Sequence, residues 1–249
     1  MAGHSKWANI KHRKARQDAK RGKAWSKCSR AIIMAARSGG GDPSANLTLR
    51  YAIDEAKAEN MPKDTIQNAI KKGTGELEGV NYEGIVYEGY GPAGVAVMLD
   101  ILTDNRNRTA GEIRKLFERG GGNLGSAGCV SYLFHRKGEL YVAKEAATEE
   151  RIMEVALEAG AEDVVADEDT WQIVCEPGQF LKVRQAVEKA GLAVRSAEWA
   201  QSPSTTVSVA GDDARKLLNL MEVLEDHDDV QKVHATFEIP QEAMAALGE

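Results

Sequence analysis

The sequence predicts an α+β protein in which an N-terminal basic arm and a three-helix bundle are followed by two ferredoxin-like α/β domains, one inserted into the other. The first observation is charge. The first 37 residues hold eleven Lys or Arg and one acid, Asp18, so they carry +10, whereas the whole chain carries −6 and the other 212 residues therefore −16. The second is a change near residue 80 from helical to alternating apolar spacing. The third is a βαββαβ order over residues 139–200, which is the order of ferredoxin-like domains.

Length, composition and cysteine usage are those of a globular cytoplasmic protein. The 249 residues, 43% of them hydrophobic, suffice for two or three compact units. The three cysteines (Cys28, Cys129 and Cys175) lie far apart, so we expect neither a disulfide framework nor a zinc site. No apolar run approaches the roughly 18 residues that span a bilayer, and the first residues lack the apolar stretch of a signal peptide. We therefore expect a cytoplasmic protein without a membrane partner.

The basic arm has no apolar face of its own. If residues 10–30 form a helix, their cations are spread over most of its circumference, and only Ala15 and Ala19 mark a neutral stripe. Because nothing before Trp25 can be buried, we expect a mobile tail or a marginal helix that is ordered by a partner. That partner is expected to be a polyanion, since the arm attracts one while the acidic body repels it.

Residues 24–73 are predicted to form the three-helix bundle. The first helix ends at three glycines, 39–41. Asp42 and Pro43 suit the N-cap and first position of a second helix, and Pro62 starts a third helix that stops at Gly73. The residues expected to face the core are Trp25, Cys28, Ile32 and Ala35 in the first helix, Leu49, Ala52, Ile53 and Ala56 in the second, and Ile66, Ala69 and Ile70 in the third. With the arm, the bundle makes a domain of residues 1–79.

Residues 80–137 are predicted to form half of an α+β domain. Alternating apolar residues indicate strands at 85–87 and 95–102, and a third strand is expected around 130–134. Between the second and the third of these strands lies a predicted helix, with a possible capping box from Thr109 to Glu112.

The rest of the chain supplies an insertion and a second half. The βαββαβ unit is followed, beyond Pro203, by a last βαβ with strands at 206–210 and 230–239. Because two strands make no stable sheet alone, this last segment is expected to complete the sheet of residues 80–137. The predicted domains are therefore 80–137 together with 203–249, and an inserted domain of residues 138–202.

Two stretches match the letters GxGxxG, at 89–94 and 120–125, but neither has the context of a dinucleotide site. Such a site follows a strand and opens a helix, so that the pyrophosphate meets free amides at the helix N-terminus. The first stretch leads into a predicted strand, and the second leaves a predicted helix. Turn and C-cap glycines explain both, and we expect no cofactor.

The segment DNRNRT at 104–109 places Arg106 and Arg108 near the start of a helix, where anions bind. The alternative is that Asp104 or Thr109 only caps the helix while the arginines pair with local carboxylates. In an acidic body this is the only other dense cationic patch, which favours a second contact with nucleic acid.

No constellation typical of an enzyme or a metal site is found. The acidic run Glu225-Asp226-His227-Asp228-Asp229 gathers oxygen ligands, but it lacks turn glycines and ligand spacing, so a solvated loop is the preferred interpretation. The other histidines have no partner at a catalytic spacing, and the sequence contains no nucleophile elbow, P-loop or HExxH. We therefore expect no catalysis and no metal.

Aromatic side chains flank the basic run and would add base stacking to its charge. Arg and aromatic residues together suit unpaired RNA bases. Core packing is favoured for Trp25, whereas Trp7 has no apolar periodic neighbours to join. The candidate nucleic-acid-binding residues are Lys6, Trp7, Lys11, His12, Arg13, Lys14, Arg16, Lys20, Arg21, Lys23, Arg106, Arg108 and Arg114.

Motifs spread over essentially the full chain resemble those of the YebC family. They are MAGHSKWANIKHRK (1–14), GK (22–23), GGDP (40–43), NMPKD (60–64), YEGYGP (87–92), DNRNRT (104–109), GGNLG (121–125), ALEAGAED (156–163), PST (203–205) and DDV (228–230). The departures are modest. The segment 24–26 stands where a Phe-Ser or Phe-Thr pair is more usual, and Cys129 replaces a frequent Ser, which argues against an essential thiol.

The resemblance implies a three-domain cytoplasmic regulator of gene expression. Bacterial members have long been labelled transcriptional regulators, with DNA binding ascribed to some. Mitochondrial members look like translational activators for cytochrome c oxidase synthesis, and bacterial relatives have been linked to ribosomes stalled at proline runs. The resemblance therefore leaves both a DNA-binding and an RNA-binding function open.

The charge of the arm distinguishes these functions. A DNA regulator needs a recognition helix with base-reading side chains on one face, whereas an arm that is basic nearly all round suits insertion between RNA strands. We therefore favour a ribosome-associated translation factor that binds ribosomal or transfer RNA and assists elongation at difficult sequences such as proline runs. The alternative is a transcriptional regulator that binds promoter DNA, and the third possibility is a small-molecule-sensing module. The sequence indicates no oligomeric state.

Overall fold

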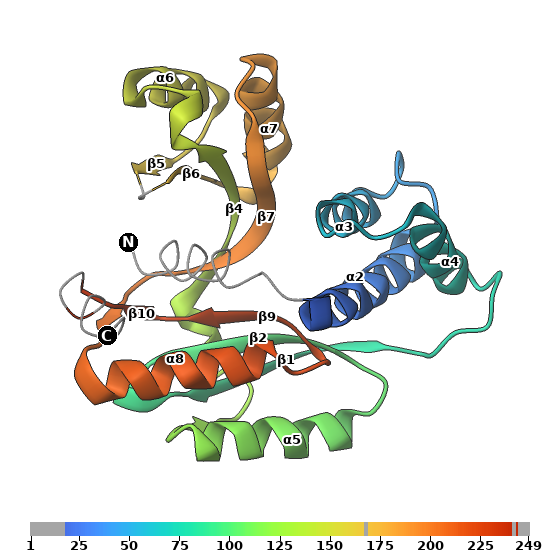
Figure 1. Ribbon diagram of the computed structural model, residues 1–249, viewed down its shortest axis with the longest axis vertical. Coiled ribbons are helices and arrows are strands. Elements are labelled where there is room, and N and C mark those ends of the chain that lie inside the picture. Colours follow the sequence, from blue (N-terminus) through green and yellow to red (C-terminus); the bar gives the residue numbers. More distant parts are fainter. Residues whose placement is uncertain (1–17, 167–168, 241–242, 244–249) are drawn as a thin grey trace. The chain divides into compact units, whose positions relative to one another are not determined.

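The computed structural model describes residues 18–166, 169–240 and 243 and shows an α+β protein (Figure 1). Its described part divides into two compact units. Of the described residues, one unit contains 18–131, 209–235, 239–240 and 243, and the other contains 132–166, 169–208 and 236–238. Within the described residues, no helix is long and apolar enough to cross a membrane.

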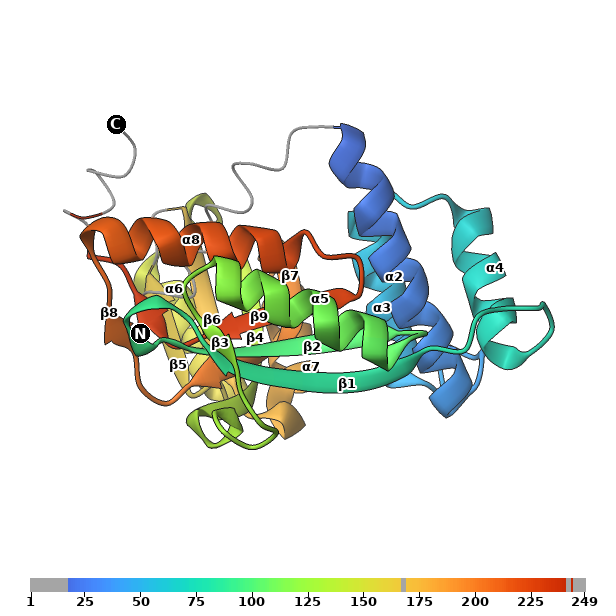
Figure 2. The ribbon, with the colours of Figure 1, turned by 90° about the horizontal axis from the view of Figure 1, so that it is seen from below.

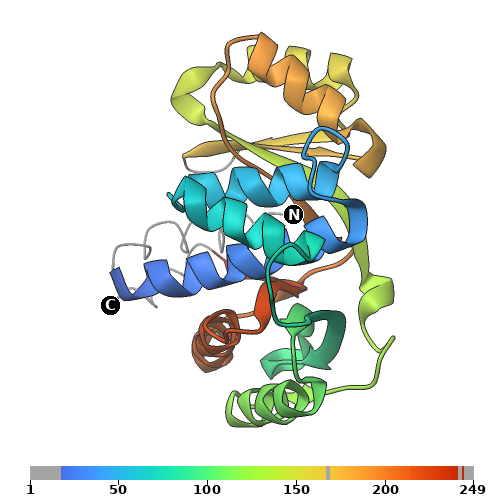
Figure 3. The ribbon, with the colours of Figure 1, turned by 90° about the vertical axis from the view of Figure 1, so that its right-hand side faces the viewer.

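The three-helix bundle consists of α2 (Asp18–Gly39), α3 (Leu47–Ala58) and α4 (Lys63–Thr74), seen together in Figure 3. The predicted core residues of all three helices are buried, except that Trp25 is only partly buried against the cluster. The indole of Trp25 donates to the carbonyl oxygen of Glu59 at 2.9 Å. Helical spacing therefore predicted the bundle core correctly.

Two helix ends differ from the prediction. Asn46, and not Asp42, is the N-cap of α3, and its Oδ1 accepts a hydrogen bond from the Leu49 amide at 3.1 Å. The Asp42 carboxylate instead accepts from the amide and hydroxyl of Ser44 and closes a turn before the helix. The helix α4 continues one residue beyond Gly73 and is ended by Gly75, which has a φ of 84°.

One unit contains a four-stranded antiparallel sheet of order β3-β1-β2-β9. Its strands are β1 (Glu83–Tyr90), β2 (Ala96–Thr103), β3 (Asn123–Leu124) and β9 (Val230–Ala235). The helices α5 (Arg106–Arg119) and α8 (Gly211–Glu225) lie side by side over one face of it, as Figure 2 shows. The last strand of this sheet thus comes from the far end of the chain.

The strand predicted around 130–134 is wrong. Residues 131–133 form a 3-10 turn, η2 (Ser131–Leu133), and the edge of the sheet is completed by β3. The amides of Val130 and Ser131 bind the Glu88 carboxylate, so they are not available to a strand ladder. The glycine stretches at 89–94 and 120–125 meet where β1 pairs with β3, and a side chain at Gly89 would lie 2.5 Å from the Asn123 carbonyl oxygen.

The strands predicted at 206–210 and 230–239 also need correction. Only residues 207–208 form a strand, β8 (Val207–Ser208), and it pairs in parallel with β10 (Phe237–Glu238) in a separate two-stranded sheet. The predicted last strand is divided between β9 and β10. The break falls at Thr236, whose carbonyl oxygen accepts from the Val207 amide at 2.9 Å.

The other unit is ferredoxin-like, as predicted. Its strands are β4 (Phe134–Ala143), β5 (Asp163–Ala166), β6 (Thr170–Cys175) and β7 (Val194–Pro203), and its helices are α6 (Glu149–Ala159) and α7 (Phe180–Lys189). The antiparallel order β5-β6-β4-β7 is that expected of a βαββαβ unit. The remaining 3-10 turns are η1 (Pro92–Gly94), η3 (Lys144–Ala146) and η4 (Pro177–Gln179).

Candidate nucleic-acid interface

The structure describes part of the predicted interface. Lys6, Trp7, Lys11, His12, Arg13, Lys14 and Arg16 lie outside the described residues. Lys20 and Arg21 lie in the first turns of α2, where only the backbone is described. The side chains of Lys23, Arg106, Arg108 and Arg114 are described, and they fall into two groups, one on α2 and one on α5.

The cations of α2 bind the turn between α8 and β9. Lys23, Lys27 and Arg30 share one face of the helix because they follow i, i+4, i+7 spacing. Their side-chain nitrogens donate to the carbonyl oxygens of Asp226 at 3.1 Å, Glu225 at 2.5 Å and Asp228 at 2.6 Å, respectively. These carbonyls lie at and just beyond the C-terminus of α8, which is the negative end of the helix dipole. The expectation of a solvated acidic loop holds only in part, because Asp226 and Asp228 are exposed whereas Asp229 is buried.

Asp229 is the centre of this contact and is only 2% exposed. Its Oδ1 accepts from Arg30 Nη1 at 2.7 Å. Its Oδ2 accepts from Arg108 Nη2 at 2.8 Å and from Thr109 Oγ1 at 2.6 Å. Burial disfavours the charged carboxylate, but the hydrogen bonds from Thr109 and Arg108 and the two guanidinium charges outweigh it and hold the pKa of Asp229 below its usual value.

The start of α5 is fixed by a different cap from the one predicted. Asn105 is the N-cap, and its Oδ1 accepts from the Arg108 amide at 3.1 Å. Thr109 is buried in the first turn and binds Asp229, so it cannot begin a capping box. The alternative considered for the arginines holds for Arg108, whose Nη2 also contacts Asp104 at 2.9 Å. The hydrogen bonds that Arg108 donates to the carboxylates of Asp229 and Asp104 raise its pKa.

The cations of α5 remain accessible. Arg106 and Arg114 are exposed, and the Arg108 side chain is 42% exposed. The hydroxyl of Tyr87, a partly exposed residue of β1, donates to the Arg106 carbonyl oxygen at 3.2 Å and places an aromatic ring beside the start of the helix. Guanidinium groups next to an aromatic ring suit phosphate contact combined with base stacking.

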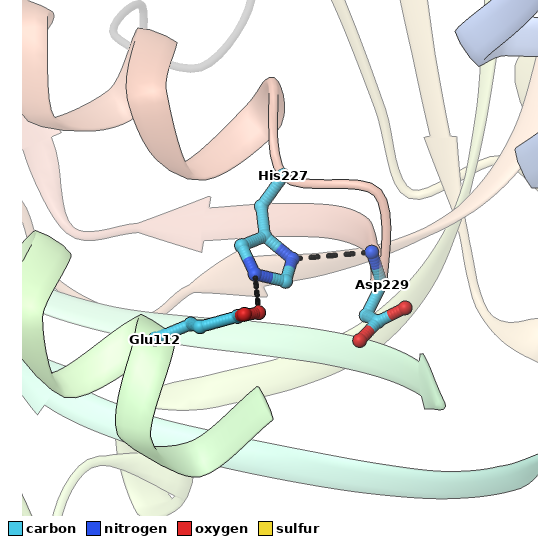
Figure 4. Close-up of side chains that lie close together, drawn as sticks. All are labelled: Glu112, His227 and Asp229. Carbon is cyan, nitrogen blue, oxygen red and sulfur yellow. Dashed lines mark hydrogen bonds and ion pairs between the residues drawn. The ribbon is translucent and has the colours of Figure 1, made fainter. Parts of the chain in front are cut away.

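Glu112, His227 and Asp229 lie close enough to suggest a metal site, but the atoms that would bind a metal already form hydrogen bonds or ion pairs within the protein (Figure 4). His227 Nδ1 accepts from the Asp229 amide at 3.1 Å, so Nε2 carries the proton that it shares with Glu112 Oε2 at 3.0 Å. The Asp229 carboxylate is neutralised by two guanidinium groups, which would repel a cation. The arrangement therefore holds the turn in place and does not fit a metal ion.

A second buried carboxylate, Glu88 on β1, orders the loop after β3. Among the described residues its carboxylate has no ion pair, and it accepts hydrogen bonds from the amides of Gly128 at 2.7 Å, Val130 at 2.7 Å and Ser131 at 2.8 Å. Burial opposes its ionisation, but these three amides outweigh burial and lower the pKa of Glu88. The sequence did not reveal the roles of Glu88 and Asp229, because nothing in a single acidic residue shows that it will be buried.

The three cysteines show no sign of activation. Burial raises the pKa of Cys28 to about 12 and that of Cys175 to about 11, and burial also raises the pKa of Cys129. Reactive thiolates require a lowered pKa. These thiols therefore act as small apolar side chains.

The fold and these contacts define a class: an α+β protein of two compact units, of which one combines a basic helical bundle with an antiparallel sheet and the other is ferredoxin-like. Residues 5–76 match the family model described as TACO1/YebC protein N-terminal domain, and residues 82–237 match the model described as TACO1/YebC second and third domain. The chain belongs to the TACO1/YebC family.

Similar proteins extend over the whole chain. One from Nitrosococcus oceani, named "Probable transcriptional regulatory protein", is 55% identical over 249 residues and covers 100% of both chains. One of the same name from Persephonella marina is 54% identical over 246 residues, 98% of each chain. The crystal structure of a conserved hypothetical protein from Aquifex aeolicus is 48% identical and has a TM-score of 0.83, covering 90% of this chain and 93% of that one.

Proposed function

We propose that this protein is a nucleic-acid-binding regulator of gene expression that acts on RNA as a ribosome-associated translation factor. The observation that carries the proposal is the exposed arginine cluster at the start of α5, which lies beside Tyr87 in a protein whose first 37 residues carry +10. The basic arm and Arg106, Arg108 and Arg114 would bind phosphates of ribosomal or transfer RNA. The sheet-containing units would act as spacers, and the factor would favour a productive geometry for a slow peptide-bond step without supplying a chemical group.

The charge pattern of α5 supports RNA over duplex DNA. Glu112 and Glu118 are exposed on the same helix as the arginines, and Asp104 precedes it. A helix lying along a major groove would bring these carboxylates near the phosphate backbones, which costs binding free energy. Contact through Arg106 and Arg108 at the start of the helix keeps Glu118 away from the phosphates, and Asp104 is already paired with Arg108. The printed names of the relatives favour the second candidate function, a transcriptional regulator that binds promoter DNA.

Small-molecule sensing is the third candidate function. The cavity beside α8 is not lined in the way that a metabolite pocket is. This cavity of about 310 Å³ lies beside η1, the end of α5 and α8. Pro92 and Ala93 are its only apolar residues that carry a side chain, whereas Arg119, Asp213 and Lys216 are charged. Metabolite pockets are lined mainly by apolar and aromatic side chains.

The test compares the intact protein with a variant lacking residues 1–17. This end point keeps α2 whole and keeps Lys23, which binds the α8–β9 turn. Co-sedimentation with ribosomes is measured alongside binding to promoter DNA over a salt series. Removing Lys6, Lys11, Arg13, Lys14 and Arg16 should weaken ribosome binding and reduce the slope of log K against log salt by about 3 to 4 for a single-stranded contact.

A matched pair of variants isolates the α5 contribution. Arg106→Ala combined with Arg114→Ala should weaken ribosome binding, whereas Arg151→Ala together with Arg184→Ala removes the same charge from α6 and α7 of the ferredoxin-like unit and should leave it unchanged. Tight, sequence-selective binding to one promoter without any ribosome association would show that the protein is a DNA regulator instead.

A further inference from the structure

We propose that Asp229 is a positioning residue of the nucleic-acid interface. It fixes the start of α5 relative to α2, so that the exposed arginines of α5 meet the nucleic acid in a set geometry. This inference rests on the proposed function, because it concerns how the same interface is held.

Asp229 joins the α8–β9 turn to three elements, β2, α2 and α5, through its backbone and its side chain. Its carbonyl oxygen accepts from the Leu102 amide of β2 at 2.9 Å, and its carboxylate accepts from Thr103 Oγ1 at 3.2 Å where that strand ends. The carboxylate also receives Arg30 from α2, and Arg108 and Thr109 from α5. One buried side chain therefore links the two helices that carry the candidate cations.

The chemistry of Arg108 leaves it able to bind a phosphate while it is held. One nitrogen, Nη2, makes both carboxylate contacts. Among the described residues, Nη1 and Nε have no hydrogen-bond partner, and the side chain is 42% exposed. A guanidinium has five donors in a planar fork, so an arginine held by one nitrogen can still present another edge to a phosphate.

Arg30 has the opposite character. Its side chain is 17% exposed and lies over the ring of Tyr82 at 5.4 Å. It is thus occupied inside the protein, and its role is to attach α2 to the turn. The two guanidinium groups on Asp229 therefore have different roles. Arg30 attaches α2 to the turn, whereas Arg108 remains accessible to a phosphate.

The direction in which Asp229→Asn changes the RNA affinity tests the inference. By simple electrostatics, removing a negative charge near a polyanion site should strengthen binding. We expect Asp229→Asn to weaken RNA binding instead, by about five- to tenfold, the size of a coupling within one hydrogen-bond network. The matched control is Asp228→Asn, which removes the same charge one residue away. Asp228 is exposed and contacts Arg30 only through its carbonyl oxygen, so this variant should bind as tightly as the wild type or slightly more tightly.

A double-mutant cycle separates positioning from a merely structural role. Arg108→Ala should weaken RNA binding, and Asp229→Asn should have little further effect when Arg108 is already absent. Thermal unfolding shows that each variant is folded at the temperature of the binding assay. If Asp229→Asn does not fold, Thr109→Val removes one of the bonds to α5 while keeping the carboxylate charge, and it should also weaken RNA binding.

The outcomes are distinct. Equal affinities for the Asp228→Asn and Asp229→Asn variants, tighter binding by Asp229→Asn, or full additivity with Arg108→Ala would overturn the inference. Failure of the wild-type protein to bind ribosomes or RNA would overturn the proposed function itself, on which the inference rests.

Discussion

Two buried carboxylates show how this chain stabilises charge away from water. Glu88, 6% exposed, is held by three backbone amides, whereas Asp229 is held by two guanidinium groups and two hydroxyls. A carboxylate that accepts several hydrogen bonds keeps its charge despite burial. Each acid therefore fixes a loop: Glu88 the segment before η2, and Asp229 the turn before β9.

The first prediction concerns the loop held by Glu88. Glu88→Gln should lower the free energy of unfolding at pH 7 by about 2 to 4 kcal/mol, because buried amides lose their charged acceptor. Urea unfolding measures the change. Glu83→Gln is the matched control on the exposed end of β1, and it should change the free energy by less than about 0.5 kcal/mol.

The pH dependence of that loss gives a further check on its cause. Because folding lowers the pKa of Glu88 from 4.5, the folded state binds fewer protons than the unfolded state. The stabilisation is therefore complete above the unfolded pKa and is lost as the pH falls through the folded pKa. The difference between the wild type and Glu88→Gln should shrink as the pH falls below about 4.5. A difference that stays constant down to pH 3 would show that the carboxylate charge is not its source.

At the level of single residues, the sequence predicted candidate cations but not their partners. Arg106 and Arg114 are exposed on α5 as expected, whereas Arg108 and Lys23 are engaged within the protein. A signal was present: Lys23, Lys27 and Arg30 recur at helical spacing on one face. It was hidden because charge was averaged over residues 10–30, and because the acidic partner lies about 200 residues away.

At the level of elements, the close packing of α2 against α4 depends on a glycine, which has no side chain. Gly73 is buried in α4, and a Cβ there would lie 2.6 Å from both the Cβ of Ala36 and the carbonyl oxygen of Ile33. Both obstacles belong to the packed face of α2, so neither can move aside freely. Gly73 therefore permits the close approach of two helices and does not end α4.

The second prediction follows from this contact. Gly73→Ala should lower the free energy of unfolding by about 1 to 3 kcal/mol through overpacking, even though Ala favours a helix by about 1 kcal/mol over Gly. The matched control is Gly111→Ala in α5, where a Cβ would meet nothing within 4 Å. That variant should gain about 0.5 to 1 kcal/mol. Thermal unfolding of both variants decides the matter, and a shift in the same direction for both would contradict the packing argument.

Helices were predicted better than strands, for a physical reason. The buried stripes of α3 and α4 follow from spacing within each helix, so neighbouring residues suffice to reveal them. Strands form only if distant partners supply a ladder. Residues 130–134 have strand-like side chains, but two of their amides bind Glu88. Residues 206–210 pair for only two positions, with β10.

At the level of the whole molecule, the basic residues near the N-terminus do not all have the same role. The first 37 residues carry +10 and the remainder −16, yet the basic segment is not uniform. Lys23, Lys27 and Arg30 bind the α8–β9 turn, and Arg37 contacts Asn81. The cations before Lys23 include five candidates that lie outside the described residues. The sequence predicted the charge asymmetry, but only the folded chain shows where the basic segment stops being available to a partner.

The last prediction concerns the proposed insertion. The strands β4 and β7 are paired from their outer ends, with Phe134 opposite Pro203, and both the amide and the hydroxyl of Ser204 donate to the Leu133 carbonyl oxygen, at 2.8 and 3.0 Å. The chain therefore enters and leaves the ferredoxin-like sheet at neighbouring points, about 5 Å apart for paired strands. Two glycines can span this gap, and closing so short a loop costs little entropy.

A variant in which residues 134–203 are replaced by two glycines should keep the bundle and the β3-β1-β2-β9 sheet, because every strand of that sheet lies outside the removed segment. It should unfold cooperatively and bind RNA within about threefold of the wild type, as expected when distant, independent parts contribute additively. Circular dichroism on heating and RNA titration are the measurements. A variant that folds but does not bind RNA would place part of the interface on the ferredoxin-like unit. Loss of cooperative unfolding would instead show that residues 134–203 are integral to the fold and not an insertion.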